Sequence, residues 1–271
     1  MEILNKYKEY LIARNQSMVY YNFIKTFLAY CEKNHVDYNN ITQETITLFF
    51  NSNKYSSNSK NNFIKAGRSF YGFLNTPEDK NEWFKITLLK VDRKIPTYLS
   101  EEDLRACIKY LNTYSSNIGT SEQKEALLFF MFYTGARKGE ILSLHRKDIN
   151  LEECSVKLWG QKSKQDRIVY FSVKVKNRLV DYFNKEQETI NAFNTTRMKI
   201  DYLIHSLNKY FPGKKISPHT FRHSFGRNLV EKGIPLGIIS KQMGHSSINT
   251  TLIYTDPNEE TIKKIMKDKI N

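Results

Sequence analysis

The sequence predicts a mostly α-helical protein of two domains, the second of which contains a small antiparallel sheet. Apolar residues recur at helical spacing through the first 75 residues and again over much of the remaining chain. Between these regions, the stretch from Leu89 to Thr97 is polar and basic and contains a proline, which is typical of a linker. From Arg146 to Phe171 the pattern changes to short alternating apolar runs around a lysine-rich turn. We therefore expect a helical domain over 1–90, a linker over 91–98 and an α+β domain over 99–271.

Four amphipathic helices are predicted in the first domain. Polar segments at 15–17 and 51–59 separate the second helix from the first and the fourth from the third. The fourth helix carries three basic side chains at polar positions, Lys60, Lys65 and Arg68. A solvated helix face explains this pattern, and so does contact with phosphate groups.

Capping residues predict the helix boundaries of the second domain. The helix starts are Ser100, with Asp103 three residues later, and Ser217, followed by Pro218. The helix ends are Gly135, Gly233 and Gly244, because glycine tolerates the left-handed conformation found there. These signals place the ends of helices close to several basic side chains.

The net charge favours a polyanionic partner. Lys and Arg number 42 and Asp and Glu number 28, which gives a formal charge of +14. Residues 1–90 carry +4 and residues 91–271 carry +10, so a partner that touches both domains is the simplest interpretation. Nucleic acid and an anionic membrane surface are the two classes of partner that such a charge suits.

Cysteine usage and hydropathy indicate a cytoplasmic protein. The cysteines, Cys31, Cys107 and Cys154, lie far apart and predict neither a disulfide framework nor a cysteine-based zinc site. The N-terminus alternates apolar and charged residues and is not a signal peptide. The longest apolar run, 126–133, is far shorter than the roughly 20 residues of a membrane span.

Residues suited to phosphate chemistry gather between Ser217 and Asp256: His219, Arg222, His245 and Tyr254. Cleavage of a phosphodiester by a side chain needs a nucleophile, a cationic cradle for the oxygens and an acid for the leaving group. Tyr254 supplies the nucleophile, and Arg222 and Arg137 supply planar guanidinium groups. A lysine between Gly160 and Arg167 is a candidate for the acid, although such a stretch taken alone is more often a solvated turn.

Two roles remain open at this point. Glu140, three residues after Arg137, either orients that guanidinium or caps the helix that follows. The two histidines also suit metal binding, but the sequence has no third ligand at regular spacing and no H-E-x-x-H. We therefore predict no metal site.

The order of these residues resembles the tyrosine recombinases, the family of phage integrases and Xer-type site-specific recombinases. The resemblance rests on Arg137, the hairpin lysine, H-T-F-R at 219–222, G-H at 244–245 and Tyr254. His245 lies 23 positions after Arg222 and nine before Tyr254, close to the family's C-terminal signature. The resemblance is strong over about 97–256, and the four-helix domain is similar to the family's SAM-like domain that binds the core site.

The resemblance implies a reaction. Tyr254 would attack the scissile phosphate to form a 3′-phosphotyrosyl link, while Arg137 and Arg222 cradle the oxygens and His219 and His245 assist. No cofactor is implied, because the covalent link retains the bond energy. The implied partner is a double-stranded DNA recombination site, bound by a homotetramer or together with a paired recombinase. The protein would then be cytoplasmic and associated with the nucleoid.

Within the hairpin, the acid is Lys162 or Lys164. The family pattern resembles G-K-x-x-K-x-R, but Gln161 follows Gly160 here, and counting back from the next strand favours Lys162. The predicted DNA contacts are Lys164, Arg167 and the three basic residues of the fourth helix, Lys60, Lys65 and Arg68.

Three further interpretations follow from the resemblance. The first helix starts near the N-terminus, which favours a Xer-like recombinase over an integrase with an arm-binding module. Ile262, Ile265 and Met266 form an apolar face that packs on its own domain or on a neighbouring protomer. The rival functions are a non-catalytic DNA-binding protein and a relaxing enzyme similar to type IB topoisomerases.

Overall fold

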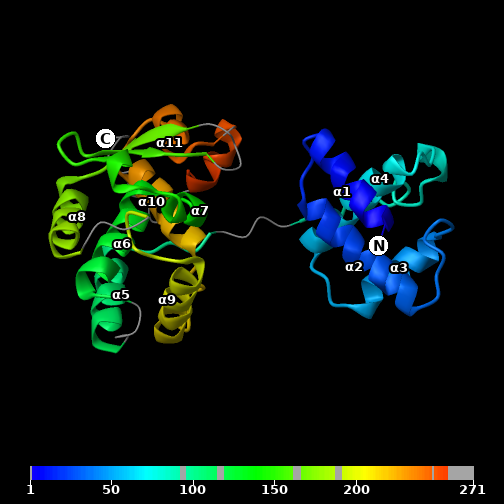
Figure 1. Cartoon of the computed structure of the whole chain (residues 1–271), viewed down its shortest axis with the longest axis horizontal. Coiled ribbons are helices and arrows are strands. Elements are labelled where there is room, and N and C mark those ends of the chain that lie inside the picture. The colour runs from blue at the N-terminus through cyan, green and yellow to red at the C-terminus, as the bar shows by residue number, and fades with distance from the viewer. Residues whose placement is uncertain are drawn as a thin grey trace, which may run out of the picture. The chain divides into compact units, whose positions relative to one another are not determined.

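The chain folds as two compact units, Met1–Lys94 and Ile95–Asn271, each with its own hydrophobic core (Figure 1). The computed structural model describes residues 2–91, 96–114, 119–160, 166–186, 191–245 and 247–255. Both units are mostly helical, which confirms the predicted fold class. The apolar face predicted around Ile265 lies outside the described residues.

The N-terminal unit contains the four predicted helices: α1 (Glu2–Ala13), α2 (Val19–Lys33), α3 (Gln43–Ser52) and α4 (Ser57–Phe73). The hydroxyls of Thr42 and Ser56 accept hydrogen bonds from backbone N–H groups in the first turns of α3 and α4 and so cap them. Their buried faces meet in a core rich in aromatic rings. Phe27 packs edge-on against both Phe49 and Trp83, with ring centroids 5.1 Å apart in each pair.

A segment after α4 completes this core, which the sequence did not predict. Trp83 is fully buried. Arg68 holds the segment in place, since its Nε donates to the Trp83 carbonyl at 3.1 Å and its Nη2 to the Ile86 carbonyl at 2.8 Å. Arg68 therefore has a structural role in place of the predicted phosphate contact. Lys65 is exposed and Lys60 lies over the Phe50 ring, and both remain predicted DNA contacts.

The C-terminal unit is arranged around α6 (Ser121–Thr134), which contacts α5 (Glu101–Tyr114), α8 (Val173–Lys185) and α10 (Pro218–Glu231). Because these helices surround it, α6 is buried on several sides, as its apolar sequence predicted. The remaining helices are α7 (Lys138–Leu142), α9 (Arg197–Tyr210) and α11 (Leu236–Met243). None of the helices in the described ranges is long and apolar enough to cross a membrane.

The predicted antiparallel sheet is present as β1 (Ile149–Asn150), β2 (Ser155–Leu158) and β3 (Arg167–Tyr170), in that order. Val156 pairs with Val169 and Leu158 with Arg167, so Arg167 is the first residue of β3 after the hairpin tip. β3 packs on α11. The tip residues 161–165, with Lys162 and Lys164, lie outside the described residues.

Three helix boundaries position the functional residues, and all three follow the predicted caps. α6 ends at Gly135 and α11 ends at Gly244, with φ of 59° and 60°, in the left-handed region. α10 begins at Pro218, and the Ser217 hydroxyl accepts a hydrogen bond from the Thr220 N–H. Two 3₁₀ turns follow α11: η4 (Ile248–Thr250) and η5 (Leu252–Tyr254).

The fit of Trp83 against α4 gives a test of the N-terminal core. A Cβ at Gly67 would lie within 3.0 Å of the Trp83 ring, whereas a Cβ at Gly72 on the same helix would meet nothing within 4 Å. We expect Gly67→Ala to lower the free energy of unfolding of this unit by about 1–3 kcal/mol through overpacking. Gly72→Ala should instead raise it by up to about 1 kcal/mol through helix propensity.

Urea unfolding in a Trp159→Phe background measures both, because Trp83 is then the sole tryptophan. Equal midpoints for the two alanine variants would contradict the packing described for Gly67.

Candidate active site

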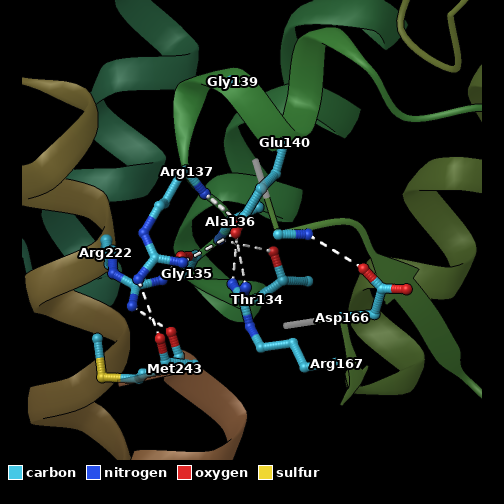
Figure 2. Close-up of polar contacts among 12 residues, drawn as sticks. Thr134, Gly135, Ala136, Arg137, Gly139, Glu140, Asp166, Arg167, Arg222 and Met243 are labelled. Carbon is cyan, nitrogen blue, oxygen red and sulfur yellow. Dashed lines mark hydrogen bonds and ion pairs between the residues drawn. The ribbon is translucent and has the colours of Figure 1, made fainter. Parts of the chain in front are cut away.

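The site forms where the end of α6, the start of α10 and the end of α11 meet (Figure 2). Arg137 lies between α6 and α7, and Arg222 lies on α10. His245 follows α11, and Tyr254 is the last residue of η5. The fold thus brings together four predicted residues from distant parts of the sequence.

Glu140 is the acceptor that holds the front of the site together. Its Oε1 accepts from Arg137 Nη1 at 2.9 Å and from Arg167 Nη1 at 2.6 Å. Its Oε2 accepts from the Arg137 backbone N–H at 2.7 Å and from Arg167 Nη2 at 2.9 Å. The carboxylate therefore both orients the Arg137 guanidinium and caps α7, the two roles that the sequence left open. Burial tends to raise the pKa of Glu140, but the bonds and charges of Arg167 and Arg137 hold it below its ordinary value.

The two predicted cradle arginines share neighbouring acceptors. Arg222 donates from Nη1 to the Gly135 carbonyl at 2.7 Å and from Nη2 to the Met243 carbonyl. Arg137 donates from Nη2 to the Gly244 carbonyl at 3.1 Å. Burial, with the nearby charges of Arg137 and Arg167, lowers the pKa of Arg222 to about 10. Arg222 is therefore still a cation at neutral pH.

The predicted role of Arg167 as a DNA contact is wrong. The sequence suggested a DNA contact, but its side chain is only 7% exposed. Two of its nitrogens bind Glu140 and its Nε donates to the Gln242 carbonyl at 2.9 Å. Gly244 allows the close approach of this side chain, since a Cβ there would lie 2.9 Å from Arg167 Cδ. Arg167 thus joins the start of β3 to α7 and to the end of α11.

Tyr254 is buried, with 1% of its surface exposed. A Cβ at Gly226 on α10 would lie 2.8 Å from the Tyr254 ring, so the glycine leaves room for it. Burial raises the pKa of Tyr254 to about 12, although the charges of Arg222 and Arg137 act in the opposite direction. The phenol is therefore protonated at neutral pH and must lose a proton to act as a nucleophile.

His223 contacts Tyr254, although the sequence did not predict it as a residue of the site. Its Nδ1 lies 3.0 Å from the Tyr254 hydroxyl. Burial, followed by the effects of His219 and Arg222, lowers the pKa of His223. The available signal was its position directly after Arg222 and one helical turn after His219, which places it on the same part of α10.

The two predicted histidines lie in different surroundings. His219 is exposed in the first turn of α10, with its ring centroid 6.4 Å from that of His223. His245 is half-buried, and its Nδ1 lies 2.8 Å from Thr251 Oγ1. Burial, with the charges of Arg222, Arg137 and Arg167, lowers the pKa of His245 to about 4, so its imidazole is neutral at neutral pH. Among the described side chains, no group of three or more His, Cys, Asp or Glu could hold a metal ion.

The Glu140 network predicts a large cost for removing one charge. Glu140→Gln leaves two guanidinium groups without their shared counter-charge, and breaking such a buried pair costs on the order of 3–5 kcal/mol. Because the pKa of Glu140 in the folded state lies below 4.5, this stabilisation is complete above that pH and is lost as the pH falls below it. Hydrogen exchange of α6 and α10 peptides at pH 7 and pH 4 measures both effects.

The matched control is Asp201→Asn, which removes the more exposed pair between Lys138 and Asp201. It should change the exchange free energy by less than about 1 kcal/mol. A Glu140→Gln variant no less stable than this control would show that the network does not hold the site.

Comparison with known proteins places this arrangement in a family. Residues 97–261 match the sequence profile of the Phage integrase family. Tyrosine recombinase XerD of Rickettsia bellii is 27% identical over 98% of this chain and 97% of its own. Tyrosine recombinase XerC of Rickettsia canadensis is 30% identical over 94% of this chain and 92% of its own.

Solved structures share the fold. The crystal structure of XerA recombinase has a TM-score of 0.55 at 22% identity and covers 99% of this chain and 98% of its own. XerH site-specific recombinase, in a post-cleavage complex with a palindromic difH substrate, has a TM-score of 0.68 at 20% identity over 94% of this chain and 80% of its own. With the family profile matching more than half of its residues, this chain belongs to the phage integrase family of tyrosine recombinases.

Proposed function

We propose that this recombinase cuts and rejoins DNA strands at a specific site through a covalent 3′-phosphotyrosyl intermediate. The observation that carries the proposal is the meeting of Tyr254, Arg222 and Arg137 at the ends of three helices. The Tyr254 hydroxyl lies 3.0 Å from Nδ1 of His223, the residue directly after Arg222 on α10, and this contact supports a phosphate bound by Arg222 close to the nucleophile.

In the forward reaction Tyr254 Oη attacks phosphorus and the bond to the 5′-oxygen breaks. Arg137 and Arg222 stabilise the charge that grows on the non-bridging oxygens, which is the largest contribution expected of such a cradle. His219 and His245 hydrogen-bond the phosphate, and a lysine of the hairpin, Lys162 or Lys164, protonates the leaving 5′-oxygen. Attack of a different 5′-hydroxyl on the phosphotyrosyl link then joins new strands.

The cradle suits a reaction without a metal ion or ATP. Two guanidiniums already supply the positive charge that a metal would bring to the phosphate, and the phosphotyrosyl link conserves the energy of the broken bond. Strand exchange between two sites requires four active sites, so we propose a homotetramer, or a tetramer with a paired recombinase, on double-stranded DNA. XerH bound to a difH substrate offers a structural precedent for DNA as the partner.

DNA binding must also move Tyr254, because a side chain with 1% exposure does not reach a phosphate in solution. η5 is a short 3₁₀ turn held by the contacts of Tyr254 with α10, so a small displacement of this turn exposes the hydroxyl. The non-catalytic rival is disfavoured because Tyr254, Arg137, Arg222 and His245 all occur in one site. Membership of a recombinase family favours strand exchange over simple relaxation.

The nucleophile is tested on sheared, lightly nicked chromosomal DNA of the organism that encodes the chain. Nicks let the short strand beyond the cut diffuse away, so the covalent adduct accumulates and is collected by potassium–SDS precipitation. We expect Tyr254→Phe to reduce the adduct to background, because the ring then lacks the attacking oxygen. The exposed Tyr202 on α9 provides the control, and Tyr202→Phe should retain full adduct formation.

Sequencing the captured DNA gives the target, and direct labelling of the released strand by polynucleotide kinase shows whether it ends in a 5′-hydroxyl. An adduct that persists in Tyr254→Phe, or a released 5′-phosphate, would contradict the proposed chemistry.

Lys162 and Lys164 are distinguished with a duplex of the captured sequence that carries sulfur at the 5′-bridging position. Thiolate leaves without a proton, so the variant that lacks the acid is rescued on this substrate. We expect Lys162→Met to cleave the oxygen substrate about 10²–10⁴-fold more slowly and to recover with sulfur. Lys164→Met serves as its matched partner and should show no such recovery; the reverse pattern would assign the acid to Lys164.

A further inference from the structure

We propose that His223 is the general base that accepts the Tyr254 proton during strand cleavage and returns it during rejoining. This inference rests on the proposed function, and it adds a catalytic residue to it. The inference is based on the contact between His223 Nδ1 and the Tyr254 hydroxyl at 3.0 Å, a distance between heavy atoms that allows proton transfer.

The direction of this hydrogen bond follows from the acidities of the partners. The Tyr254 phenol has a pKa of about 12, and burial, His219 and Arg222 hold the pKa of His223 below its ordinary value, so both groups are neutral at neutral pH. An imidazole nitrogen is a much stronger proton acceptor than a phenol oxygen, so we assign the phenol as the donor to Nδ1 and place the proton of the neutral imidazole on Nε2. This is the protonation state in which the imidazole can accept.

Because His223 lies on α10, its ring stays close to the Tyr254 hydroxyl and to the phosphate when η5 moves. His223 directly follows Arg222, whose guanidinium is fixed by the carbonyls of Gly135 and Met243. A phosphate held by Arg222 therefore lies beside the same helical turn as the His223 ring. Tyr254 must approach that phosphate to attack it, so its hydroxyl stays near Nδ1.

The other histidines are less suited to this step. Nδ1 of His245 is engaged with Thr251 Oγ1 at 2.8 Å, and its ring lies nearly parallel to that of Tyr254, at 15° and 6.2 Å between centroids. His219 is exposed at the start of α10, where it suits contact with DNA. His223 is the histidine for which the structure gives a hydrogen bond to the phenol.

In this step each bond that forms is matched by a bond that breaks. The Tyr254 Oη–H bond breaks as the Oη–P bond forms, and the proton moves to His223 Nδ1. The P–O5′ bond breaks, and the 5′-oxygen takes a proton from the hairpin lysine. Because free transfer from a phenol to this imidazole is strongly uphill, the proton moves together with formation of the Oη–P bond. In rejoining, the 5′-hydroxyl gives its proton to the lysine, and protonated His223 returns its proton to Tyr254.

The pH dependence of cleavage then reports on His223. Protonation of its Nδ1 blocks acceptance, so the rate falls as the pH drops through the pKa of His223, which burial, His219 and Arg222 hold below its ordinary value. The titratable and charged groups around it are His219 and Arg222 on α10, Tyr254 on η5, and His245 after α11. The pKa of His245 is about 4, below the range from pH 5 to pH 8 in which the test is made.

The test is single-turnover adduct formation by the full chain on the nicked duplex that the adduct capture identifies, from pH 5 to pH 8. His223→Asn keeps an acceptor close to the position of Nδ1 but cannot take up a proton, so it preserves the hydrogen bond and removes the base. We expect it to cleave about 10²–10⁴-fold more slowly at pH 7, without the fall at low pH. DNA affinity in a mobility-shift assay should change less than about twofold, since phosphate contacts carry the binding.

One further substrate and two further variants make the test more specific. His205→Asn, at an exposed position on α9, is the matched control and should behave as the wild type. The substrate with sulfur at the 5′-bridging position rescues loss of the acid but not loss of the base, so His223→Asn should stay slow on it. His223→Phe, which has no acceptor, should be equally slow, with wild-type DNA affinity as the evidence that it is folded.

Wild-type rates in His223→Asn, a retained fall at low pH, or rescue by sulfur would each overturn the assignment. A wild-type chain that forms no adduct on any DNA would overturn the proposed function and this inference with it. A wild-type adduct together with an unaffected His223→Asn variant would overturn this inference alone.

Discussion

The candidate active site depends on one buried carboxylate that binds two guanidinium groups. Glu140 is 2% exposed on its side chain and accepts four hydrogen bonds, from Arg167 and from the side chain and backbone of Arg137. An isolated carboxylate at such a depth would take up a proton, and an isolated guanidinium would be driven to the surface. The three groups are stable together, and because they come from β3, α7 and the turn before it, their pairing also fixes the relative positions of those elements.

This network leaves the site with an excess of positive charge. Arg137, Arg167 and Arg222 act on one another and on His245 through their charges, and Glu140 balances only one of them. Burial, and after it the charges of Arg137 and Arg167, lower the pKa of Arg222, so part of the electrostatic strain on this guanidinium comes from the neighbouring cations. A phosphate relieves that strain, and a transition state with more negative charge than the phosphodiester relieves it further. In the proposed reaction, Glu140 therefore offsets the repulsion among the cations during folding, and the substrate phosphate offsets it during cleavage.

Local signals in the sequence predicted the parts of the site, and long-range contacts decided their roles. Glycine and serine caps located the ends of α6, α10 and α11, and so the positions of Arg137, Arg222 and His245, because capping depends on residues a few positions apart. Arg167 and Arg68 were misread because a basic residue near a turn or on a polar helix face has the same local pattern whether it is solvated or buried against a distant acceptor. His223 was missed for the same reason, since its partner lies 31 positions away.

The same electrostatic environment leaves the histidines of the site neutral and its arginines charged. Burial and the neighbouring arginines lower the pKa values of His223 and His245, so at neutral pH these rings add no positive charge to a site that already has an excess. In the proposed reaction, phosphate binding is thereby left to guanidiniums, which keep their protons at neutral pH. Proton transfer is left to neutral imidazoles, which can accept one. A carboxylate close to His223 would favour the protonated form of its imidazole. The ring could then not accept a proton from Tyr254.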